Sequence, residues 1–216
     1  MSGHRYRKRL ALAIAALGVI SVLAAPARAD IVVITGVNNQ GTDNVLLNPA
    51  TDVLTVTGVV GPSSVLVNFT SDSGSGLLNA DPSGQARVSG GTGNIALTNL
   101  DFSLANDDTF TRAVFNINAG ADGSVLIHVE GINIDGGSFE ADFLLDANGQ
   151  NFFTVTAING QEISSIDLTA LNGAFFEDVR QVRLGGIPSS VPEPSSLVLL
   201  GSAVIGVAVL RGRLRR

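Results

Sequence analysis

The sequence predicts an all-β body with an antiparallel β-sandwich or jelly-roll-like fold, and three observations support this. Apolar and polar residues alternate with a period of two in several short segments, as in half-buried strands. Asn-Gly and other Gly-rich turns separate these segments, and no stretch of the body shows a helical period with caps. About ten strands of this kind favour packed antiparallel sheets over a βαβ architecture.

The N-terminal residues 1–29 have the pattern of a signal peptide with an apolar helix. Basic residues between Arg5 and Arg9 precede an apolar stretch from Leu10 to Ala25. Ala27 and Ala29 are small residues at the spacing that a signal peptidase accepts, so we expect cleavage between Ala29 and Asp30. The alternative is a retained membrane helix, because the apolar stretch approaches spanning length. Either way the body leaves the cytoplasm.

Residues 30–187 have the length of one domain with a hydrophobic core. Four arginines oppose 18 acidic residues there, so the net charge of this body is −14, against −6 for the whole chain. A body this acidic repels phosphate backbones and anionic lipids, so nucleic acid is not an expected partner. The absence of cysteine excludes disulfides, thiol catalysis and cysteine metal sites.

The strand pattern also predicts which side chains enter the core. One buried face is expected from Val65, Val67 and Phe69, from Ala113, Phe115 and Ile117, from Phe139, Ala141, Phe143 and Leu145, and from Phe153, Val155 and Ala157. The five phenylalanines of this set should therefore share one core between the sheets. Residues 72–93 are rich in Ser, Gly and Asp, which predicts loops and one short strand near Ala86 to Ser89.

Turn residues predict how the later strands are connected. Asn148-Gly149 and Asn159-Gly160 lie between strand-like segments, and Asn-Gly is favoured at the centre of type I′ hairpin turns. We therefore expect a meander of paired neighbours across residues 123–168. The apolar parity of residues 125–134 changes at Gly131, which indicates a β-bulge.

The body offers few residues for catalysis. His128 is its sole histidine and lies two residues from Glu130, so a His-carboxylate pair on one strand face is possible. No serine lies in a Gly-x-Ser-x-Gly elbow. Asp72-Ser73-Gly74 resembles one half of an aspartic-protease dyad, but no second such loop occurs. We therefore expect a body that is not an enzyme.

Asp-rich turns are the more plausible ligand sites. They are Asp107-Asp108, Asp122-Gly123, Asp135-Gly136-Gly137 and the turn from Asp146 to Gly149. Their oxygens suit calcium, although aspartate and glycine are also common turn formers, so calcium stays possible and no other cofactor is expected. Sugar binding is possible too, but the body lacks Trp and Tyr, so an aromatic platform would have to be phenylalanine.

The C-terminal residues 188–216 combine a linker with a membrane segment. Pro192, Glu193 and Pro194 lie in the Pro/Ser linker of residues 188–196, where the two prolines oppose both helix and strand. Residues 197–216 hold a 14-residue apolar run followed by arginines. As a helix the run spans about 21 Å, against about 30 Å of hydrocarbon. Flanking residues let it cross as a transmembrane helix, with the arginines on the cytoplasmic side.

This C-terminal end resembles the PEP-CTERM sorting domain of exported bacterial envelope proteins. The matching residues are Val191, Pro192, Glu193 and Pro194, followed by the apolar run and then Arg211, Arg213, Arg215 and Arg216. The resemblance implies that a membrane-embedded exosortase removes the tail, so that the protein is membrane-anchored in transit and then at the cell surface or outside the cell. It also implies association with exopolysaccharide and biofilm. A plain tail anchor is the alternative.

The most plausible function from these observations is a non-enzymatic, exosortase-sorted surface or matrix protein. A calcium-dependent carbohydrate-binding module is the alternative, followed by a hydrolase. The processing partners would be signal peptidase and exosortase, and the sorting tail does not itself name an activity because it occurs on many unrelated bodies.

Overall fold

The computed structural model describes residues 30–187, apart from residues 62, 75, 84–85, 94 and 133–136. The expected signal peptide with its cleavage residues Ala27 and Ala29, the Pro/Ser linker and the membrane helix therefore lie outside the described residues. The first described residue, Asp30, already belongs to a strand. Within the described ranges, no helix is long and apolar enough to span a membrane.

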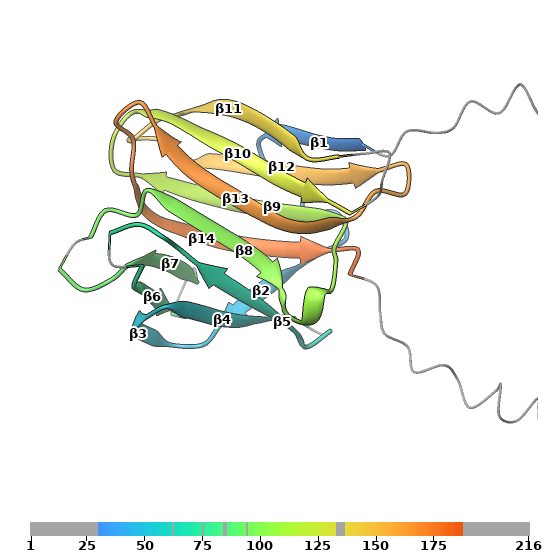
Figure 1. Cartoon of the computed structure of the whole chain (residues 1–216), viewed down its shortest axis with the longest axis horizontal. Coiled ribbons are helices and arrows are strands. Elements are labelled where there is room, and N and C mark those ends of the chain that lie inside the picture. Colours follow the sequence, from blue (N-terminus) through green and yellow to red (C-terminus); the bar gives the residue numbers. More distant parts are fainter. Residues whose placement is uncertain are drawn as a thin grey trace, which may run out of the picture.

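The described residues form an all-β, antiparallel sheet that is nearly closed and almost without helix. This confirms the predicted all-β class, whereas the predicted sandwich of separate sheets is instead one continuous sheet. One half contains β1 (Asp30–Thr35), β12 (Asn151–Ile158), β9 (Arg112–Ala119) and β14 (Phe176–Gly185). The other half contains β4 (Thr55–Val60), β5 (Val65–Thr70), β8 (Asn99–Leu104), β13 (Ile163–Leu171), β10 (Gly123–Gly131) and β11 (Phe139–Leu145). In Figure 1 the long strands β13 and β10 cross in front of β9 and β12.

Two features connect and extend these halves. Strand β2 (Thr42–Leu47) pairs with β14 on one side and with β4 on the other, so the chain of pairings is continuous. The short strands β7 (Arg87–Gly90), β6 (Leu78–Asp81) and β3 (Ala50–Val53) form a flap that is attached to β14 through β7. A short 3-10 helix, η1 (Ala105–Asp107), follows β8.

A chain of phenylalanine rings runs through the core between the two halves. Phe102 on β8 contacts Phe115 on β9 edge to face, with ring centroids 5.6 Å apart. Phe69 extends this chain in one half, and Phe153 and Phe143 continue it at the other end. The predicted core faces are confirmed for most of their residues. Val65, Phe139, Phe143 and Ala157 are only half-buried against the core, Ala141 is not part of it, and Phe102 was not singled out.

The predicted meander is wrong beyond its first hairpin. Strand β10 pairs with β11 as expected, but β12 pairs with β1 and β9 in the opposite half, and β13 pairs with β8 and β10. Asn159 and Gly160 do adopt positive φ, at 56° and 83°, whereas Asn148 and Gly149 do not. The residues of a turn determine its local backbone angles, but they do not determine which strands pair. Here the strands on either side of the turn lie in opposite halves, because each buries its apolar face in the core there.

Two smaller expectations also have outcomes. The register of β10 against β13 shifts between Glu130 and Gly131, which confirms the predicted bulge. In the Ser/Gly-rich region, β7 matches the expected short strand, whereas β6 was not predicted. Sequence periodicity misses β6 because it has only four residues.

The segment between β1 and β2 covers the outer side of β12 and β9. The Asn38 N–H donates to the Thr154 hydroxyl at 3.0 Å, and the Arg112 guanidinium donates to the Gln40 carbonyl at 2.6 Å. Val114 and Asn116 on β9 are also buried, although their parity places them away from the core.

Candidate ligand-binding pocket

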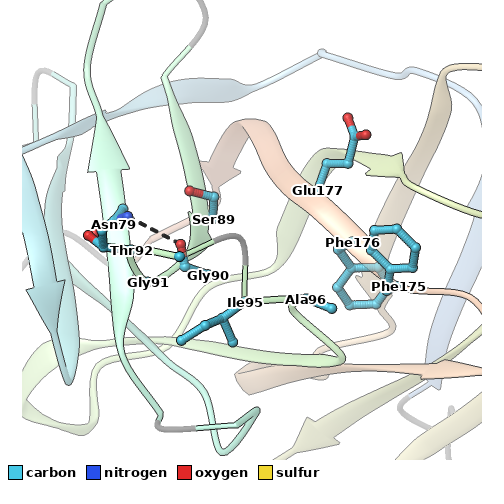
Figure 2. A pocket seen from close by; sticks show the side chains of 11 residues that line it. Asn79, Ser89, Gly90, Gly91, Thr92, Ile95, Ala96, Phe175, Phe176 and Glu177 are labelled. Atoms are coloured by element: carbon cyan, nitrogen blue, oxygen red, sulfur yellow. Dashed lines mark hydrogen bonds between the residues drawn. The ribbon is translucent and has the colours of Figure 1, made fainter.

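A cavity of about 570 Å³ opens where β7 separates from β14 (Figure 2). These strands pair at Val179 with Val88 and at Arg180 with Arg87. Further along β14, the segment that precedes β8 takes the place of β7, because the Phe176 N–H donates to the Leu97 carbonyl at 2.7 Å. The cavity lies in the resulting fork.

A β-bulge in β14 lies beside this cavity and involves an acidic residue of its lining. The register against β9 shifts between Phe176, which is opposite Ala119, and Asp178, which is opposite Asn118. Glu177 is the extra residue, and such bulges commonly redirect one side chain. Asn118 Nδ2 donates to Glu177 Oε2 at 2.7 Å, which orients the carboxylate beside the cavity.

Phe175 supplies an aromatic surface at the same place. Its ring lies against Gly120, where a Cβ atom would be only 2.0 Å from the ring Cε2 atom. Glycine at position 120 therefore lets the ring pack onto the backbone of the neighbouring strand. Of the ten phenylalanines, Phe175 and Phe152 are the two that belong neither to the buried core nor to the side chains packed against it.

A glycine-rich turn after β7 forms the opposite wall. The Asn79 amide holds this turn, because its Nδ2 donates to the Gly90 carbonyl at 3.2 Å and its Oδ1 accepts from the Asp52 N–H at 2.8 Å. Gly90 has no room for a side chain, since a Cβ would lie 2.2 Å from the Ile95 carbonyl oxygen. The Thr92 N–H donates to Asp52 Oδ1 at 2.6 Å, and this hydrogen bond lowers the pKa of Asp52.

The charge of the cavity comes from Glu177. All four arginines of the body contact other residues: Arg87 pairs with Asp81, Arg180 with Asp178, Arg112 with the Gln40 carbonyl, and Arg183 with Thr42 and Asn44. Glu177 is thus an exposed carboxylate in the cavity lining without an arginine partner. Ser89 and Thr92 add hydroxyl groups to the same lining.

Sequence reasoning did not single out this pocket. One local feature of the sequence could have indicated its aromatic side chain. Phe175 and Phe176 are adjacent, so period-two alternation places one ring in the core and the other outside it. The bulge that moves Glu177 and the fork between β7 and β14 depend on long-range pairing, which periodicity does not report.

The structure places the sequence-predicted His128 between two glutamates. Its Nε2 lies 3.3 Å from Glu130 Oε2, as the spacing suggested, and its Nδ1 lies 3.2 Å from Glu140 Oε2 on β11. Across the other edge of β10, His128 is opposite Asp167. Both ring nitrogens therefore face carboxylates. Asp72 is an exposed residue after β5, and its N–H donates to Asn99 Oδ1 at 2.9 Å.

Two of the Asp-rich turns use their carboxylates in local structure. Asp122 Oδ1 accepts from the Ala147 N–H at 2.9 Å, and Asp146 Oδ1 accepts from the Asn148 N–H at 2.8 Å. The turn at Asp135 lies outside the described residues. Across the described part of the chain, no group of three or more His, Cys, Asp or Glu side chains is arranged to hold a metal ion.

Residues 190–216 match the model of a protein family that is described as "PEP-CTERM protein-sorting motif". The chain carries a PEP-CTERM sorting motif. This match contains the predicted residues from Val191 to Pro194 and the four terminal arginines, all of which lie outside the described residues. No curated protein and no solved structure matches the chain.

The PEP-CTERM motif indicates an exported protein that is sorted to the cell surface, with exosortase as its processing partner. It accounts for the tail and leaves the β-sheet body without an assigned ligand.

Proposed function

We propose that the chain is a non-enzymatic surface or matrix protein, which exosortase releases from a transient membrane anchor. The observation that carries the proposal is the PEP-CTERM motif at residues 190–216, directly after an all-β body. In this proposal the body acts outside the cell, in association with exopolysaccharide or biofilm.

The geometry around His128 supports a non-enzymatic role. A hydrolase triad needs a histidine nitrogen that accepts a proton from a nucleophile, and a second nitrogen held by an acid. In this structure Glu130 and Glu140 each approach one ring nitrogen of His128 on a solvent-facing strand surface. This arrangement suits a charge network on the surface better than the activation of a serine.

Carbohydrate binding remains the second candidate, and the pocket beside Phe175 is the observation that favours it. An aromatic surface next to a few polar groups in a cavity is typical of small-ligand sites. The calcium dependence that we expected as part of this alternative has less support, because Asp122 and Asp146 are engaged as turn caps.

Mass spectrometry of protein from the native host tests the sorting proposal. We expect a mature form that begins at Asp30 and ends between Pro192 and Ser196, without the apolar run and the terminal arginines. Native protein that retains Arg216 in the membrane fraction would support a permanent tail anchor and contradict the proposal.

A further inference from the structure

We propose that the cavity between β7 and β14 binds an uncharged sugar ring of a polysaccharide. In this site Phe175 provides the surface against which the apolar face of the ring packs, and Glu177 accepts hydrogen bonds from its hydroxyl groups. The inference rests on the proposed function, because an exported protein is the one that meets extracellular polysaccharide.

The position of Phe175 is the first argument. Phe175 is half-buried and lies outside the core, so part of its ring is accessible beside the cavity. Gly120 fixes the position of the ring, since the ring packs directly on this residue and no side chain intervenes. The ring is thus held in place before any ligand arrives, which lowers the entropy cost of binding.

The polar groups around the ring match a ligand that is rich in hydroxyl groups. Glu177 offers two acceptor oxygens, and Ser89 and Thr92 offer hydroxyls that both donate and accept. Asn118 already orients Glu177, so the acceptor is positioned without ligand. A purely apolar ligand would leave these groups without hydrogen bonds, which is unfavourable.

The negative charge of the body favours uncharged sugars over acidic ones as the ligand. A net charge of −14 and the carboxylate of Glu177 in the lining both oppose uronic acids and sulfated sugars. The volume of about 570 Å³ lies within the range of small-ligand pockets, which is about 300 to 1,000 Å³. The cavity therefore fits one or two uncharged rings at the surface of a polymer.

Binding assays on the full chain test the proposal. The chain would be purified in a detergent without a sugar head group and titrated with uncharged polysaccharides: dextran, laminarin, soluble starch and the neutral fraction of the producer's own polysaccharide. Chitosan oligosaccharides and alginate provide the amine-bearing and acidic arms. We expect binding to at least one uncharged polymer and no saturable binding to alginate.

Matched variants locate the binding site. Phe175→Ala should weaken binding by about tenfold, because it removes the aromatic contact. Glu177→Gln should weaken it by about tenfold as well, since a charged acceptor becomes neutral. Phe152→Ala removes the other phenylalanine that lies outside the core, on a different part of the sheet, and should leave the affinity unchanged. Circular dichroism melts of all variants control for folding.

The results separate the two proposals. Binding to none of the uncharged polymers, binding to chitosan alone, or equal losses in Phe175→Ala and Phe152→Ala would each overturn the sugar site. None of these outcomes changes the processed mass of the native protein, which tests the sorting proposal. If native protein is processed at both ends but no uncharged polymer binds, the sorting proposal stands and the sugar site is overturned.

Discussion

Asp101 on β8 lies directly opposite Asp167 on β13, so two carboxylates occupy one cross-strand pair. His128 is opposite Asp167 on the next strand, and Thr70 is opposite Asp101 on the other side. Burial, together with the charge of Asp167, raises the pKa of Asp101 from 3.8 to about 6. Like charges at this position oppose the folded state.

This pair predicts a specific dependence of stability on pH. The folded state holds the Asp101 proton more tightly than the unfolded chain does. Protonated Asp101 therefore contributes to the free energy of unfolding, and this contribution is fully present below about pH 4 and is lost as the pH rises through about 6. Asp101→Asn should therefore stabilise the protein at about pH 7, by about 1 to 2 kcal/mol after allowance for partial exposure. Below about pH 4 the effect should vanish.

Urea unfolding at both pH values measures this difference. Asp142→Asn is the control, because Asp142 is an exposed carboxylate on β11 opposite Leu126 and not opposite another acid. An Asp101→Asn effect of equal size at both pH values would contradict the proposed cause.

The ring chain of the core predicts unequal costs of truncation. Phe115 is fully buried and contacts both Phe102 and Phe153, so Phe115→Ala should reduce the free energy of unfolding by about 3 to 5 kcal/mol. Phe139 is half-buried at the edge strand β11, and Phe139→Ala should cost about 1 to 2 kcal/mol. Chemical denaturation of both variants tests this order, and equal losses would show that the core does not discriminate between the two rings.

The Asp178–Arg180 pair should matter more for stability than the surface pair Asp81–Arg87. The Arg180 Nη2 atom donates to Asp178 Oδ2 at 2.6 Å, and the Asp178 side chain is only 8% exposed. Arg180→Gln leaves this buried carboxylate without its cation, which should cost about 3 kcal/mol. Arg87→Gln should change the thermal midpoint little, because both partners of that pair face solvent.

A double variant checks the cause. Asp178→Asn combined with Arg180→Gln removes both charges, so it should recover part of the loss seen in Arg180→Gln alone. A double variant that is as unstable as the sum of its single variants would argue against charge pairing as the source of the loss.

The Pro-Glu-Pro element of the tail should control retention in the membrane. Replacing Pro192, Glu193 and Pro194 with alanines should leave unprocessed protein in the membrane fraction of the native host, because the extended recognition segment is lost. A Ser189→Ala and Ser190→Ala variant alters the adjacent linker and should be processed normally. Immunoblots of membrane and extracellular fractions measure both outcomes, and equal processing of all variants would contradict the prediction.

Local patterns in the sequence predicted the class of the fold and most strand faces. The alternation around Phe69, Phe115 and Phe153 correctly placed these rings in the core, because the side chains of a strand alternate between two faces whatever its partners are. The parity change at Gly131 likewise corresponded to a bulge. The sorting motif was also readable, since its elements follow one another in the chain.

Partner strands and the pocket were decided by the tertiary structure alone. The Asn159-Gly160 turn has the predicted backbone angles, yet its flanking strands join opposite halves of the sheet, because pairing is chosen by burial across the whole core. Phe175, Glu177 and Ser89 meet only because β7 diverges from β14 at one point. Such meetings depend on contacts between residues far apart in the chain, and short-range periodicity carries no information about which distant residues those are.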